Sequence, residues 1–102
     1  MVVEYIRYTV PPEQSAAFEA AYAEAVHSLE ADPHCHGHEV TRCVEDAVSY
    51  IVRLLWDSVE GHMEGFRKGP NFPPFLAAIR PFIPQIDEMR HYEYVGGPWH
   101  RD

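Results

Sequence analysis

The chain has 102 residues, which is the size of one domain with a single core. Its composition, with 46% hydrophobic and 24% charged residues, is that of a globular protein and not of a disordered one. The formal charge of −8 argues against nucleic acid and anionic membranes as partners, because both are bound through basic patches.

The first two predicted elements are a strand and a long helix. Residues 2–10 are rich in Val, Ile and Tyr, and neither face of this segment is uniformly polar, which predicts an inner strand. Pro11 and Pro12 end it, since proline cannot continue a central ladder. Residues 13–31 favour a helix because alanine and glutamate predominate there. Apolar residues recur at the helical period: Phe18, Ala21, Tyr22, Ala25, Val26 and Leu29.

A hairpin and a capped helix follow in the predicted order. Residues 37–44 and 48–56 are typical of two strands joined by a turn at 45–47. The second strand is apolar almost without interruption, broken only by Arg53, so we expect both of its faces to be covered. A helix is then predicted from Ser58, a good N-cap, to about Lys68.

The last predicted elements are a helix and a strand. Asn71 and Pro73 suit the start of a helix, and Pro81 and Pro84 break or kink its end. A strand over 89–95 completes the order βαββ(α)αβ. This order predicts an α+β, ferredoxin-like fold, with a four-stranded antiparallel sheet and helices on one face. We expect one domain over residues 1–96 and a short tail over 97–102.

Expected partners and location follow from the pattern of apolar residues. The second face of the sheet also carries apolar and aromatic side chains, which are not left in water, so the sequence predicts a homodimer formed through that open face. No secretory segment follows Met1, and no apolar run approaches the roughly 20 residues that span a bilayer. The expected location is therefore the cytoplasm.

His34, Cys35, His36 and His38 form the densest group of metal-binding residue types. Imidazoles and a thiolate can hold zinc or copper. The spacing matches no standard zinc pattern, so a solvated loop that enters a strand is favoured and no metal site is predicted. On one strand Cys35 and Cys43 would lie about 26 Å apart, too far for a disulfide, and both are expected to be reduced.

Two residues beside the long apolar strand are candidates for chemistry. His62 lies on the helix that follows Trp56 and can act as a base or hydrogen-bond donor in a cavity; the alternative is an exposed helix histidine. Arg53 must be paired if it is buried, either with a glutamate or with a bound anion. Strand parity turns Arg53 away from Tyr50 and Trp56, so these three side chains cannot all line one cavity.

Aromatic residues are candidates for the walls of a pocket. The last strand places His91 on one face and Tyr92 and Tyr94 on the other. Together with Tyr5, Tyr50 and Trp56 these tyrosines can enclose a flat ligand, or they can simply fill the core or an interface. The sequence has no glycine-rich phosphate loop and no nucleophile elbow, so no nucleotide site is predicted.

Several stretches together resemble a known family. They are VVEYIRYTVPPEQSAAFEAAY, PHCHGHEVTRCVED, YIVRLLWDSVEGHMEGFR and EMRHYEY. The chain resembles the antibiotic biosynthesis monooxygenase superfamily over about residues 2–95. It is also similar to the monooxygenase-like domains attached to truncated haemoglobins of actinobacteria. The resemblance implies a homodimeric α+β barrel whose enzymatic members oxidise a polycyclic phenol or anthrone with O2 to a quinone, without metal or flavin.

The resulting hypothesis is a monooxygenase without a cofactor that acts on an aromatic or quinol-type small molecule. The alternative is a dimeric small-ligand binder without catalysis, since fold does not fix function. Haem degradation is disfavoured because Phe66 stands where haem-degrading members carry a Trp, and the following helix has no histidine. The candidate catalytic residues are His62, His91 and Arg53, and the candidate substrate-binding residues are Tyr50, Trp56, Phe66 and Tyr5.

Overall fold

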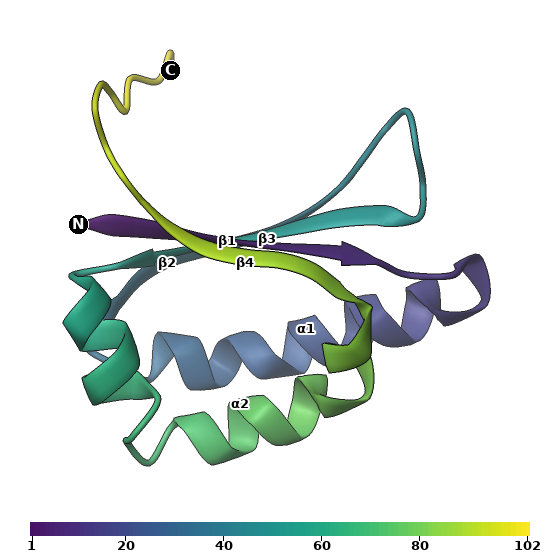
Figure 1. The fold of residues 1–102 in the computed structure, drawn as a ribbon, viewed down its shortest axis with the longest axis horizontal. Coiled ribbons are helices and arrows are strands. Elements are labelled where there is room, and N and C mark those ends of the chain that lie inside the picture. Colours follow the sequence, from purple (N-terminus) through teal and green to yellow (C-terminus); the bar gives the residue numbers. More distant parts are fainter.

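One antiparallel sheet with helices on a single face makes up the computed structural model, which describes residues 1–102 (Figure 1). The strands are β1 (Val2–Thr9), β2 (Cys35–Arg42), β3 (Ser49–Trp56) and β4 (Ile86–Glu93), in the sheet order β2-β3-β1-β4. The two α-helices, α1 (Ser15–Glu30) and α2 (Phe72–Ile79), cover the same face of the sheet. The predicted ferredoxin-like α+β fold is confirmed. None of the helices is long and apolar enough to cross a membrane.

The core lies between this face and the helices. In the central strands β1 and β3, alternate side chains point toward the helices, and the register places Tyr8 opposite Tyr50 and Ile6 opposite Val52. The helix α1 contributes one buried stripe at the predicted spacing. These residues form one hydrophobic cluster, whose α1 members are Phe18, Tyr22, Ala25 and Leu29.

The observed strand bounds differ from the predicted ones where a partner strand decides the pairing. The strand predicted over 37–44 is Cys35–Arg42, because its partner β3 continues to Trp56, opposite Cys35. The strand predicted over 89–95 is Ile86–Glu93, because β1 offers ladder partners from Val2 to Tyr8. Hydrophobic pattern alone does not contain this information.

The helix predicted over 58–68 has a different geometry. Ser58 caps it as expected, since its Oγ accepts a hydrogen bond of 2.8 Å from the amide of Gly61. Val59 and Glu60 are α-helical, and the chain then forms a π-helical turn, η2 (Gly61–Phe66). In this turn the amide of Arg67 donates a hydrogen bond of 2.9 Å to the carbonyl of His62. A π-turn carries an extra residue per turn and is frequent at functional sites.

The other face of the sheet is not covered by any helix (Figure 1). Tyr5 and Tyr92 pack edge to face on it, with ring centroids 5.4 Å apart, and Ile51 and Tyr92 are exposed. Beyond β4 the C-terminal segment runs away from the sheet and carries the exposed Trp99. We call this uncovered surface the open face.

Candidate functional site

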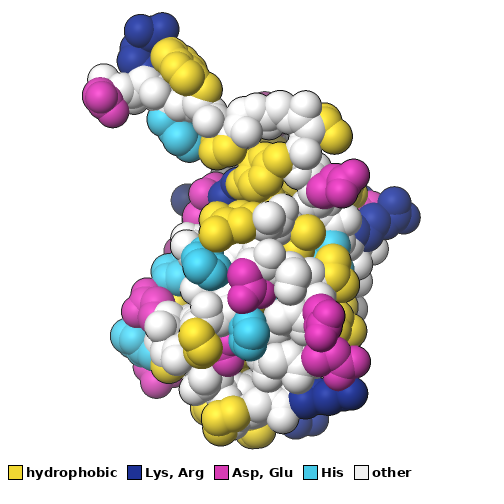
Figure 2. Space-filling model, turned by 90° about the vertical axis from the view of Figure 1, so that its left-hand side faces the viewer, with side chains coloured by type: hydrophobic (Ala, Val, Ile, Leu, Met, Phe, Trp, Pro, Cys, Tyr) yellow, Lys and Arg dark blue, Asp and Glu magenta, His cyan; other side chains and the backbone are white.

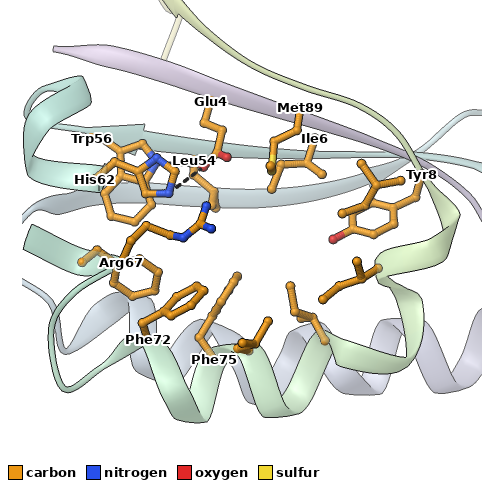
Figure 3. Close-up of a pocket in the computed structure, with 15 residues that line it drawn as sticks. Glu4, Ile6, Tyr8, Leu54, Trp56, His62, Arg67, Phe72, Phe75 and Met89 are labelled. Atoms are coloured by element: carbon orange, nitrogen blue, oxygen red, sulfur yellow. Dashed lines mark hydrogen bonds and ion pairs between the residues drawn. The ribbon is translucent and has the colours of Figure 1, made fainter. Parts of the chain in front are cut away.

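A cavity of about 170 Å³ lies between the helix-covered face of the sheet and α2 (Figure 3). Twelve of its fifteen lining residues are hydrophobic, so it suits a largely apolar ligand. Glu4, His62 and Arg67 gather at one end, and Tyr8 lies at the other. The remaining lining residues are Ile6, Leu54, Trp56, Phe66, Phe72, Phe75, Leu76, Ile79, Ile83, Ile86 and Met89.

Glu4 is a buried carboxylate at the polar end of the cavity. Only 2% of it is exposed, and its Oε1 accepts a hydrogen bond of 3.0 Å from Nε1 of Trp56. Burial raises the pKa of Glu4 to about 7, although the Trp56 hydrogen bond and the charge of Arg67 act in the opposite direction. Near neutral pH the carboxyl group therefore exists in both protonation states, as a general base requires.

His62 connects this carboxylate to a second histidine. Its ring is 4% exposed and stacks on Trp56, with centroids 4.3 Å apart and planes 13° from parallel. Its Nε2 lies 3.6 Å from Oε1 of Glu4, and its Nδ1 lies 2.7 Å from Nε2 of His91. Burial, followed by His91 and Arg67, lowers the pKa of His62 to about 4. The ring is therefore neutral near pH 7, with one nitrogen that accepts and one that donates.

His91 comes from the edge strand β4 and is only partly buried. Burial lowers its pKa from the usual histidine value. The ligand atoms of Glu4, His62 and His91 all lie within 4.8 Å of one another, close enough for a metal group. However, Glu4 and His91 stand at opposite nitrogens of one ring, whereas an imidazole binds a metal through a single nitrogen. His62 therefore lies between the two other groups, within hydrogen-bond distance of His91 and slightly beyond it from Glu4.

Arg67 brings a positive charge to the polar end. It follows η2 directly, and its guanidinium lies over the ring of Phe72, 4.9 Å from the centroid. Figure 3 shows this side chain pointing toward the cavity near Glu4 and His62. A cation beside a buried base can stabilise an anion that forms when the base removes a proton from a ligand.

Four of the predicted site residues take part in this site, each from the expected element. His62, Trp56 and Phe66 line the cavity, and His62 is buried and not an exposed helix histidine. His91 joins through its hydrogen bond to His62.

The structure does not bring Arg53, Tyr5 or Tyr50 to this cavity. The parity of β1 and β3 places Arg53 and Tyr5 on the open face, where the guanidinium of Arg53 donates to the hydroxyl of Tyr94 at 2.7 Å and lies 3.6 Å from Glu39. Tyr50 faces the helices, but its hydroxyl donates to a carboxylate of α1 at 2.6 Å in a shallower groove between α1 and β2. The parity prediction that separates Arg53 from Trp56 is confirmed.

The histidines of residues 34–38 do not converge on one point. His34 pairs with Asp57 at 2.8 Å, and His38 pairs with Glu30 at 2.7 Å. Figure 2 shows histidine and acidic side chains interspersed on this end of the molecule. His34 and His38 are therefore each paired with a different carboxylate.

Sequence reasoning missed Glu4 and Arg67 as members of the site. A signal exists for Glu4, because strand parity puts it on the same face as Ile6 and Tyr8 in an otherwise apolar segment. An ionisable group on the buried side of an inner strand is a functional-site signal. Arg67 gives no such signal, since a basic residue near the end of a helix is common.

Comparison with known proteins gives a consistent result. The family model described as antibiotic biosynthesis monooxygenase matches residues 1–78. An uncharacterised Bacillus subtilis protein, YczJ, is 24% identical over 78 residues, which cover 76% of this chain and 82% of that protein.

Solved structures show the same fold. A Bordetella bronchiseptica protein assigned to the antibiotic biosynthesis monooxygenases superimposes with a TM-score of 0.81 at 26% identity, over 92% of this chain and 96% of that chain. SnoaB, a cofactor-independent oxygenase from Streptomyces nogalater, gives a TM-score of 0.76 at 20% identity, over 94% of each chain. At that identity the second likeness concerns the fold alone.

Proposed function

The chain belongs to the antibiotic biosynthesis monooxygenase family, and we propose that it oxidises a phenolic or quinol-type aromatic compound with O2 without a cofactor. The observation that carries this proposal is a buried carboxylate with a pKa of about 7 beside a guanidinium, at the end of an apolar cavity. The fold shared with SnoaB supports the same chemistry.

Substrate binding follows from the lining of the cavity. The aromatic ring lies among the apolar side chains, and the hydroxyl group lies at the polar end. Ionised Glu4 removes the phenolic proton, and Arg67 faces the phenolate that results. Because most of the lining is apolar, the guanidinium stabilises the anion more strongly than it would in solution.

A proton relay through His62 and His91 carries the proton away from the site. When substrate binding closes the 3.6 Å gap between them, protonated Glu4 donates to Nε2 of His62 while Nδ1 of the same ring donates to His91. These two transfers move one proton from the buried carboxylate to the partly exposed His91. Glu4 is then ionised again while the ring of His62 stays neutral, as its low pKa requires.

The oxidation itself needs only the substrate and O2. The phenolate is electron-rich and supplies all the electrons that reduce O2. One oxygen atom becomes a carbonyl on a ring carbon that loses its hydrogen. The other oxygen atom leaves as water, with that hydrogen and the phenolic proton. The protein contributes binding, proton transfer and electrostatic stabilisation.

We further propose that the protein is a homodimer formed through the open face. Ile51 and Tyr92 are exposed there, and Arg53 is held between Tyr94 and Glu39. Exposed apolar side chains on a sheet face are typical of an interface between subunits.

The proposed activity is tested by O2 consumption with electron-rich phenols, in the presence of a strong chelator. We expect saturable uptake and quinone absorbance in the wild type, and loss of both in His62→Phe, which fills the ring position but cannot transfer a proton. Saturable binding of phenols without O2 uptake would instead identify a ligand-binding protein that does not catalyse oxidation.

A further inference from the structure

The volume of the cavity limits which aromatic compounds it can hold. An engineered cavity of about 150 Å³ binds benzene, whereas drug-sized ligands occupy pockets of roughly 300–1,000 Å³. The cavity here measures about 170 Å³. We propose that the site takes a phenol with a single ring and one ionisable hydroxyl, and excludes fused ring systems. This inference rests on the proposed function, because it names the substrate class of the same site.

The two ends of the cavity fix its length. At the polar end Glu4 is held by Trp56, whose ring also stacks on His62. At the far end Tyr8 is fully buried, and its hydroxyl shares a hydrogen bond with Tyr22. Moving either end would break a buried hydrogen bond, which costs about 1–3 kcal/mol for each polar group left unpaired.

The floor is equally restricted by aromatic packing. Phe66 packs edge to face against Phe72 and Phe75, with centroids 5.6 Å and 5.4 Å away. These three rings come from η2 and α2, and Phe66 and Phe75 are buried. Close-packed interiors do not widen for one additional ring without a cost.

The cavity opens to solvent on its remaining side. Met89 and Ile83 line it and are 49% and 39% exposed, so they form its mouth. Neither belongs to the polar end or to the aromatic floor. We therefore identify Met89 and Ile83 as the residues whose size decides whether a second ring can enter.

The test measures binding and turnover separately. The protein has two tryptophans, and Trp99→Phe removes the exposed one, so the remaining fluorescence reports on Trp56 beside the site. Phenol, a naphthol and an anthrone are titrated, and O2 uptake is recorded with each. We expect saturable quenching by phenol and at least ~10-fold weaker binding of the two fused compounds. If affinity depended only on the transfer of apolar surface out of water, the two fused compounds would bind more tightly than phenol, because larger rings bury more apolar area.

Enlarging the mouth provides the specificity control. Met89→Ala and Ile83→Ala are expected to strengthen the binding of naphthol relative to that of phenol. Met63→Ala is the matched control, since Met63 is 40% exposed on η2 and lies outside the cavity lining. It should leave all affinities unchanged.

The outcomes separate this inference from the proposed function. Phenol binding without O2 uptake would support the size limit and reject the oxygenase assignment. Binding and oxidation of an anthrone as effectively as phenol would reject the size limit and support the oxygenase assignment. Failure of phenol to bind at all would overturn the size limit directly.

Discussion

Glu4 shows how burial sets the chemistry of a single residue. A carboxylate in water has a pKa far below 7, but Glu4 is enclosed by Trp56, His62 and apolar side chains. The cost of charging it there raises its pKa to about 7. The same cost makes Glu4 unfavourable for stability, and general-base catalysis is the role that we propose for it.

We predict that Glu4→Gln lowers kcat/KM by about 10²–10⁴-fold, because an amide can still accept the Trp56 hydrogen bond but cannot take a proton.

The same substitution should also remove a pH dependence of stability. The folded-state pKa lies above the usual value of 4.5, so the native protein binds the extra proton between about pH 4.5 and pH 7 and loses stability as pH rises through that window. Urea unfolding should show the wild type losing up to about 3 kcal/mol relative to Glu4→Gln. If the difference in unfolding free energy between the wild type and Glu4→Gln did not change across this pH range, the raised pKa would be contradicted.

We predict that His91 releases the proton of the relay to solvent and does not bind the substrate. His91→Gln should lower kcat by about 10-fold or more with little effect on KM, because proton release is slowed while the cavity is intact. Added imidazole should restore part of the rate. His38→Gln, which removes a surface histidine paired with Glu30, is the control. A wild-type rate in His91→Gln, or a loss that imidazole does not rescue, would count against the relay.

The π-turn η2 is the element that assembles the site. It places His62 and Phe66 on the cavity side and delivers Arg67 at its end. Its close approach to the neighbouring loop depends on Gly61 and Gly65, since a Cβ on Gly65 would overlap the ring of His34. The ring of His34 thus packs against the element that carries His62.

We predict that Gly65→Ala destabilises the fold by up to about 1–3 kcal/mol and lowers activity, because the added methyl displaces either η2 or the His34 ring that is hydrogen-bonded to Asp57. The double variant Gly65→Ala with His34→Ala should recover part of the loss, since the clash is removed. Gly96→Ala, where a Cβ meets nothing, is the neutral control. Thermal unfolding and O2 uptake measure the series, and equal losses with and without His34 would rule out this contact as the cause.

At the level of elements the sequence is informative about type and less so about geometry. The spacing of Phe18, Tyr22 and Leu29 predicts α1 and its buried face correctly. A helix after Ser58 is also predicted, but its π-turn is not, since that geometry depends on glycines meeting a loop from elsewhere in the chain. Local pattern does not contain contacts of that kind.

At the scale of the whole molecule, strand alternation explains both the successes and the misses. Parity correctly puts Trp56 and Arg53 on opposite faces. It also groups Tyr50 with Trp56, yet only Trp56 reaches the cavity, because α1 rather than α2 covers Tyr50. The positions of the helices decide which part of a sheet face is packed and which part borders a cavity. The sequence pattern alone does not contain these positions.

The open face leads to a prediction about assembly. We expect sedimentation at micromolar concentration to give a dimer, and Ile51→Glu to shift it toward monomer by placing a charge in the proposed interface. Val44→Glu is the matched control, because Val44 is exposed and lies beyond the end of β2. A monomeric wild type would contradict the dimer.

Transfer of one atom of O2 to the substrate is the defining step of the proposed reaction. The most direct measurement is oxidation of a single-ring phenol under isotopically heavy O2 with a chelator present, followed by mass spectrometry of the product. We predict a quinone with one heavy oxygen atom, water that carries the other heavy oxygen atom, and a much slower formation of both by Glu4→Gln. A quinone without the label, or no oxidation of a phenol that binds saturably, would contradict it.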